Sequence, residues 1–88
     1  MVRVKFKKGK QKEFLDLVRL NLSSPSIRGL LQFGFSMRYS ALKNYYTERR
    51  LLPKVLFDEM LHLAKIDGES LNVEFVKDTW GQVKGGRK

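Results

Sequence analysis

Hydrogen-bonding side chains occupy many of the positions from 36 to 47, and their spacing carries the clearest chemistry of this chain. At about 100° per residue, a helix through this stretch turns Met37, Ala41, Leu42 and Tyr45 toward a core and leaves an opposite face that contains no acid. Lysine donates to guanine O6 and N7, asparagine pairs with adenine, and serine and threonine bond several bases. Such a face could read base edges through Ser36, Tyr39, Ser40, Lys43, Asn44 and Thr47, with Tyr46 also turned outward.

Basic side chains flank this face and fill the amino-terminal segment. Cations in such places can bind phosphate oxygens and fix the register of a protein on a nucleic acid. For the lysines, protection of an exposed strand edge against aggregation is an equally good interpretation, and both can hold. The candidate phosphate contacts are Arg38, Arg49, Arg50, Lys5, Lys7, Lys8 and Lys10.

The sequence offers no catalytic or metal-binding constellation. It contains no cysteine and a single histidine, His62, which excludes a Cys/His zinc site and a disulfide framework. No Ser/His/Asp set has supporting context, and the terminal KGGRK lacks the strand-loop-helix setting of a phosphate-binding loop. We therefore expect neither an enzyme nor a cofactor or metal.

Length and charge limit the class of protein. Eighty-eight residues make one domain, and 18 Lys and Arg against 9 Asp and Glu give a net charge of +9, which favours an anionic partner. No apolar run approaches the roughly 20 residues that span a bilayer. The basic start, MVRVKFKKGK, is not followed by the apolar stretch of a signal peptide. We expect a cytoplasmic protein that does not contact membranes.

Two segments alternate with a period of two and predict strands. Val2, Val4 and Phe6 alternate with basic residues, and the segment from Leu71 to Phe75 alternates in the same way. An isolated strand is unstable, so the two should pair with each other. Antiparallel pairing would bring Glu74 near Arg3 or Lys5, a favourable cross-strand charge match.

Between the strands, helical spacing predicts four amphipathic helices. The first runs from Gln11 to Leu22, and the second opens at Ser24-Pro25 and ends at Gly34. The third runs from position 37 or 38 to Thr47 with Ser36 as its cap, and after a loop from Glu48 to Leu52 the fourth opens at Pro53. The second helix would bury Ile27, Leu30 and Leu31. The fourth would expose Asp58 and Glu59 to solvent and bury Val55, Leu56, Met60, Leu63 and Ala64.

These elements predict a mainly α fold: a helix-turn-helix four-helix core with a small two-stranded antiparallel sheet formed by the amino- and carboxy-terminal strands. Residues 1–79 would form this single domain, and residues 80–88 a basic, glycine-rich tail.

The segment SIRGLLQFGFSMRYSALKNYYTERRLLPKVLFDEMLHLAKID resembles the helix-turn-helix core of lambda-repressor-like (Xre-type) DNA-binding domains. That family has a small residue in the turn, a Ser-capped recognition helix, a basic loop, and then a proline with a leucine-rich helix. The matching residues are Gly34, Ser36, Leu42, Tyr45, Arg49, Arg50 and Pro53. The spacing from Gly34 to Leu42 exceeds the usual turn, and the flanking strands are not part of the common five-helix form. WGQVKGG is similar to a stretch of some archaeal helix-turn-helix and homing-endonuclease-related proteins, which implies an archaeal-type variant.

The resemblance and the charge together imply a protein that binds double-stranded DNA, as a sequence-specific transcriptional regulator with its third helix in the major groove. A palindromic site would require a homodimer, and the exposed sheet edge is where a second copy could join. Two alternatives stay open. One is RNA binding, with Tyr39, Tyr46 and Trp80 stacked on unpaired bases. The other is a protein-interaction adaptor without a nucleic-acid partner.

Overall fold

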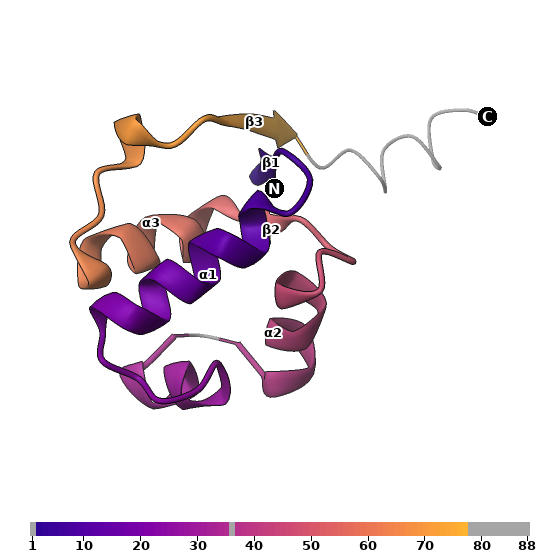
Figure 1. Ribbon diagram of the computed structural model, residues 1–88. Helices are drawn as coiled ribbons and strands as arrows, with labels where there is room; N and C mark the ends of the chain where they lie inside the picture. The colour runs from indigo at the N-terminus through magenta and orange to yellow at the C-terminus, as the bar shows by residue number, and fades with distance from the viewer. Residues whose placement is uncertain (1, 36, 78–88) are drawn as a thin grey trace.

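The protein folds as a small α/β domain, which a computed structural model describes for residues 2–35 and 37–77 (Figure 1). Helices α1 and α3 lie beside each other under the sheet, and η1 and α2 lie on the far side of α1 (Figure 1). In chain order the elements are β1 (Val2–Phe6), α1 (Lys10–Asn21), the 3-10 helix η1 (Arg28–Phe33), α2 (Tyr39–Tyr46), β2 (Leu52–Pro53), α3 (Lys54–Ala64), the 3-10 helix η2 (Gly68–Ser70) and β3 (Val73–Lys77).

The expected pairing of the terminal strands is confirmed. Strands β1 and β3 are antiparallel, with Val4 opposite Phe75 and Lys5 opposite Glu74. The expectation of a two-stranded sheet is wrong, because β2 pairs with the other side of β1 and gives the order β2-β1-β3. Two residues are too few to show an alternating pattern, so the sequence could not separate β2 from the predicted loop.

A single apolar core joins the sheet to the helices. Three aromatic rings from β1, α1 and α3 pack together in it: the Phe6, Phe14 and Phe57 centroids lie 5.2–5.9 Å apart, with Phe6 only partly buried. Tilted and edge-on rings at such separations attract each other beyond their apolar burial. The buried apolar residues are Val4, Phe14, Leu15, Val18, Leu30, Phe35, Leu42, Tyr45, Leu52, Leu56, Phe57, Met60 and Ala64.

The second predicted helix is shorter and tighter than expected. It is a 3-10 helix that begins at Arg28, not at Ser24-Pro25, and it ends at Gly34 in the predicted left-handed conformation, with φ 85°. Serine side chains explain the late start, since they compete for local backbone groups. The Ser24 hydroxyl donates to the Ser26 carbonyl, and the Ser26 hydroxyl accepts from the Gly29 N–H.

Helix α3 begins immediately after Pro53, as expected, but its buried face is rotated. Val55 and Leu63 are 72% and 43% exposed, whereas Phe57 is only 2% exposed. The buried set is Leu56, Phe57, Met60 and Ala64. Because Phe57 lies about 200° around the helix from Val55, its ring and the side chain of Val55 cannot both face the core. The larger aromatic ring decides the orientation. None of the helices in the described part of the chain is long and apolar enough to cross a membrane.

Candidate nucleic-acid interface

Helix α2 is anchored by one face and exposed by the other. Leu42 and Tyr45 are buried in the core, and Ala41 is half-buried beside them. Of the predicted base contacts, the side chains of Tyr39, Ser40, Lys43 and Thr47 are exposed; Asn44 is half-buried, and Ser36 lies outside the described residues. The inward and outward sides of α2 therefore follow the 100° spacing of its sequence.

The predicted cap and one outward tyrosine are corrected by the structure. Arg38, not Ser36, occupies the N-cap position, in extended backbone and without a side-chain cap bond. Tyr46 is half-buried, and its hydroxyl donates to Asp16 Oδ1 on α1 at 3.0 Å. Desolvation, reinforced by this hydrogen bond and the Asp16 charge, raises the pKa of the Tyr46 hydroxyl. The phenol therefore fastens α2 to α1.

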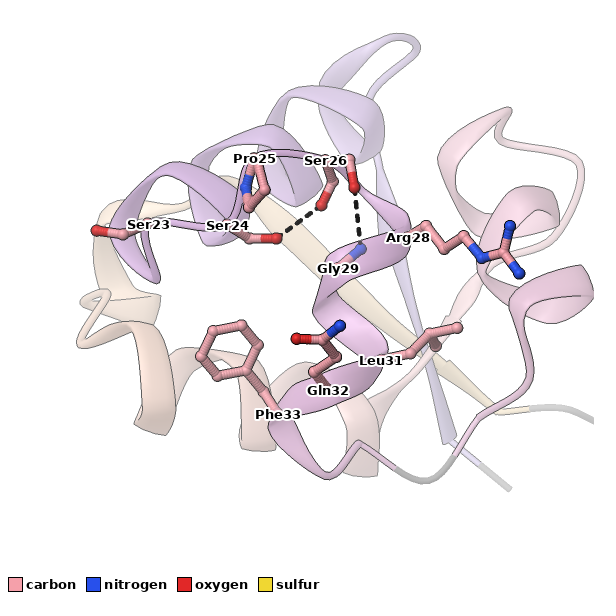
Figure 2. Close-up of a pocket in the computed structure, with 9 residues that line it drawn as sticks. All are labelled: Ser23, Ser24, Pro25, Ser26, Arg28, Gly29, Leu31, Gln32 and Phe33. Atoms are coloured by element: carbon pink, nitrogen blue, oxygen red, sulfur yellow. Dashed lines mark hydrogen bonds between the residues drawn. The ribbon is translucent and has the colours of Figure 1, made fainter.

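Two cationic side chains lie close to the exposed Tyr39 ring. The Arg28 guanidinium lies 5.1 Å from its centre and the Lys43 ammonium 5.9 Å, both within the range of cation–π attraction. Arg28 comes from η1, and its side chain extends away from that helix (Figure 2). Arg28 is not among the contacts predicted from the sequence, since no linear pattern places it beside Tyr39. Residues of η1 and α2 thus form one cationic surface, with Tyr39 at its centre.

A second polar contact fixes the loop that follows α2. The Glu48 carboxylate accepts the Gly9 N–H at 2.9 Å and the Lys12 N–H at 3.1 Å, at the start of α1. These backbone hydrogen bonds hold the pKa of Glu48 below its ordinary value. Glu48 has φ 65°, a left-handed conformation that a glutamate rarely adopts, so the contact maintains an unfavourable backbone state.

A buried glutamine completes the attachment of this loop to α1. Gln11 is 3% exposed, and its Nε2 donates to the carbonyls of Tyr45 and Arg50 at 2.7 and 2.8 Å. Its Oε1 accepts from the Leu52 N–H at 3.4 Å. The sequence held a signal that was overlooked: Gln11 lies three and four residues before Phe14 and Leu15, hence on the buried face of α1.

The two contacts place most of the predicted phosphate contacts in adjoining segments. Lys7 and Lys8 are exposed in the turn before α1, and Arg49 and Arg50 are exposed in the loop bound to that turn by Glu48 and Gln11. Arg38 is exposed at the other end of α2.

Lys5 and Lys10 differ from the other predicted phosphate contacts because each has an acidic neighbour. Lys5 stands opposite Glu74 in the sheet, and Lys10 pairs with Glu13 at 3.2 Å. An exposed pair of this kind contributes little to stability. It does offset the positive charge that either lysine presents to a phosphate.

An open hollow of about 460 Å³ lies beside η1 and is lined by Ser24, Ser26, Arg28 and their neighbours (Figure 2). Its serines are engaged with each other and with the backbone, at 2.8 and 3.2 Å. No buried side-chain polar atom in the described residues lacks a hydrogen-bond partner. The same residues contain no group of three acidic or histidine side chains suited to a metal ion.

Comparison with protein-family models, with curated proteins and with solved structures gives no match to this chain.

Proposed function

We propose that the protein binds double-stranded DNA by placing α2 in the major groove. The observation that carries the proposal is the two-sided character of α2: an apolar side held in the core, and an outer side of Tyr39, Ser40 and Lys43 that is exposed and free of acids. An α-helix with its side chains is about 10–12 Å across, which fits the major groove, about 12 Å wide. In this proposal η1 and α2 form a helix-turn-helix of the lambda-repressor-like kind.

The exposed polar and basic residues of α2 and its neighbouring segments have distinct roles in this proposal. Lys43 and Ser40 read base edges, since a lysine can donate to guanine and a serine to several bases. Arg38 and the Arg49-Arg50 loop bind phosphates on either side of the groove, and Lys7 and Lys8 extend that contact. Selective reading of this kind would suit a transcriptional regulator.

RNA binding is the weaker proposal because its stacking surface is reduced. Of the aromatic residues expected to stack on bases, Tyr46 is bound to Asp16, and Trp80 lies outside the described residues, as does the predicted tail 80–88. Tyr39 is exposed, but Arg28 and Lys43 already lie near its ring. A single occupied ring is a poor platform for successive unpaired bases.

The experiment is a selection of bound duplexes from a random pool, followed by affinity measurements on the selected site. Lys43→Gln should weaken that site about 5- to 150-fold and relax selectivity, since one good base contact is worth about 1–3 kcal/mol. Lys65→Gln is the matched control, because Lys65 is also exposed but follows α3. It should change affinity much less.

Two results would oppose the proposal. The first is equal affinity and selectivity of the Lys43→Gln protein and the parent. The second is preference for single-stranded RNA over every selected duplex when the two compete at the same salt concentration, which would favour the RNA-binding alternative.

A further inference from the structure

The two edges of the sheet are protected to very different degrees. The β2 edge is two residues long and contains Pro53, which has no N–H to donate. Strand β3 forms the other edge with five residues, VEFVK, and contains neither proline nor glycine. Among the described residues, β3 pairs with β1 alone, so one row of its backbone groups is available. The charged residues of β3 are Glu74 and Lys77, and an edge strand of this length is a template for another strand.

The side chains of β3 also leave the apolar layer incomplete. Phe75 lies on the helix-facing side of the sheet, opposite the fully buried Val4. Its ring centre is 6.1 Å from that of Phe57 and 5.5 Å from the Lys54 ammonium. Phe75 nevertheless remains 53% exposed. The apolar layer therefore stops partway across this ring, at the same edge where the backbone is unpaired.

We propose that a second copy of this chain pairs with β3, strand to antiparallel strand, about a twofold axis at Phe75. A twofold axis perpendicular to the sheet keeps the same face inward in both copies. Each odd-numbered residue of β3 must therefore lie opposite an odd-numbered residue of the second copy, and each even-numbered residue opposite an even-numbered one. Phe75 then faces Phe75 of the second copy, Val73 faces Lys77, and Glu74 faces Val76. The inner face gains a continuous apolar row, Val4–Phe75–Phe75–Val4, and no like charges stand directly opposite each other.

The shape of the assembly favours a second copy over an unrelated strand. Over the described residues, joining the β3 edges yields a six-stranded sheet whose outer edges are the short β2 strands with Pro53 and the parts of β1 that β2 does not cover. The same edge serves both partners, so the contact closes on itself and does not propagate into a fibre.

The dimer should be weak and should respond to salt. Two five-residue strands bury less than the roughly 1,200–2,000 Å² of a standard interface, and two chains of charge +9 repel each other. Added salt screens this repulsion and strengthens the pairing, whereas it weakens binding to DNA. The pairing is independent of the proposed DNA binding, and each is measured without the other.

Disulfide formation tests the pairing and its register, since the chain has no cysteine of its own. Phe75→Cys should form a disulfide-linked dimer, because directly opposed Cα atoms lie about 4.5–5.5 Å apart, within disulfide reach. Val73→Cys alone should not, because its two copies would be about 13 Å apart along the strands. Mixing Val73→Cys with Lys77→Cys should restore the link. Glu69→Cys, exposed on η2, reports random collision.

Paired charge variants give a second measurement that is free of cysteine. Phe75→Glu and Phe75→Lys should each sediment as monomers, because like charges would meet at the axis. An equimolar mixture should associate again. Circular dichroism of each variant identifies loss of folding, and the disulfide experiment does not depend on these variants.

The proposal is overturned if Phe75→Cys links no faster than Glu69→Cys, or if Val73→Cys links as well as Phe75→Cys. A wild-type protein that sediments as a monomer at about 1 mM in high salt overturns it as well, since pairing weaker than about −4 kcal/mol would have no role.

Discussion

Two polar side chains hold the candidate interface to the core, and each binds groups that are far away in the sequence. Gln11 binds three backbone groups between Tyr45 and Leu52 from a buried position. Tyr46 fixes the end of α2 to Asp16. A buried amide has this effect because the groups it contacts have few other partners, and leaving them without one is costly. The position of the Arg49-Arg50 loop therefore depends on a single residue of α1, Gln11.

Replacement of Gln11 by leucine tests this dependence. Gln11→Leu keeps the approximate shape but removes the partners of two carbonyls and one N–H, so it should destabilise the fold by about 2–3 kcal/mol. Urea denaturation measures the change. Gln32→Leu is the matched control, because Gln32 is exposed, and it should alter stability by less than about 0.5 kcal/mol. Equal stability of the two variants would show that water replaces the Gln11 contacts.

At the scale of elements, the sequence predicts what repeats over several residues and fails where one contact decides. The length of α1, the two strands β1 and β3, and the inner side of α2 all follow from the period of the apolar residues. The brevity of η1 depends on serine hydroxyls, β2 on the burial of Leu52 against β1, and the phase of α3 on Phe57. In the candidate site, the contact of Arg28 with Tyr39 and the bond of Tyr46 to Asp16 join residues 11 and 30 positions apart. Periodicity carries no information about either contact.

The start of α1 provides an element-scale prediction. Gly9, at its N-cap, makes no side-chain cap bond, and Glu48 supplies the acceptor from across the fold. Because folding lowers the pKa of Glu48 from 4.5, its stabilisation is complete above that pH and is lost as the pH falls through the folded value. Glu48→Gln should thus be less stable than the parent at neutral pH, and the difference should shrink in acid. Urea titrations from about pH 7 to about pH 3 measure it.

Glu13→Gln is the control for this experiment, since it removes another carboxylate from the first turn of α1 that pairs only across an exposed surface. The stability of Glu13→Gln should differ from that of the parent by less than the stability of Glu48→Gln does, over the whole pH range. A Glu48→Gln difference that stays constant with pH would mean that the carboxylate charge contributes nothing to the cap.

For the whole molecule, the charge of +9 sets the response of both proposed associations to salt. Each lysine or arginine that neutralises a phosphate releases a counterion from DNA, so affinity falls steeply as salt rises. Pairing of two like-charged copies responds in the opposite sense, because salt reduces their repulsion. A palindromic DNA site would bring two copies together where phosphates offset the charge. The two associations can then occur in one complex although they oppose each other in free solution.

The salt dependence of DNA binding distinguishes phosphate contacts from base contacts. Arg49→Gln should flatten the slope of log affinity against log salt by about 1 and weaken selected and unselected duplexes alike, because a phosphate contact carries no sequence information. Lys65→Gln removes the same charge from the end of α3 and should leave the slope nearly unchanged. Filter binding over a series of salt concentrations measures both slopes. If the two variants change the slope equally, the overall charge, and not the loop after α2, accounts for binding, and the placement of α2 in the groove loses its support.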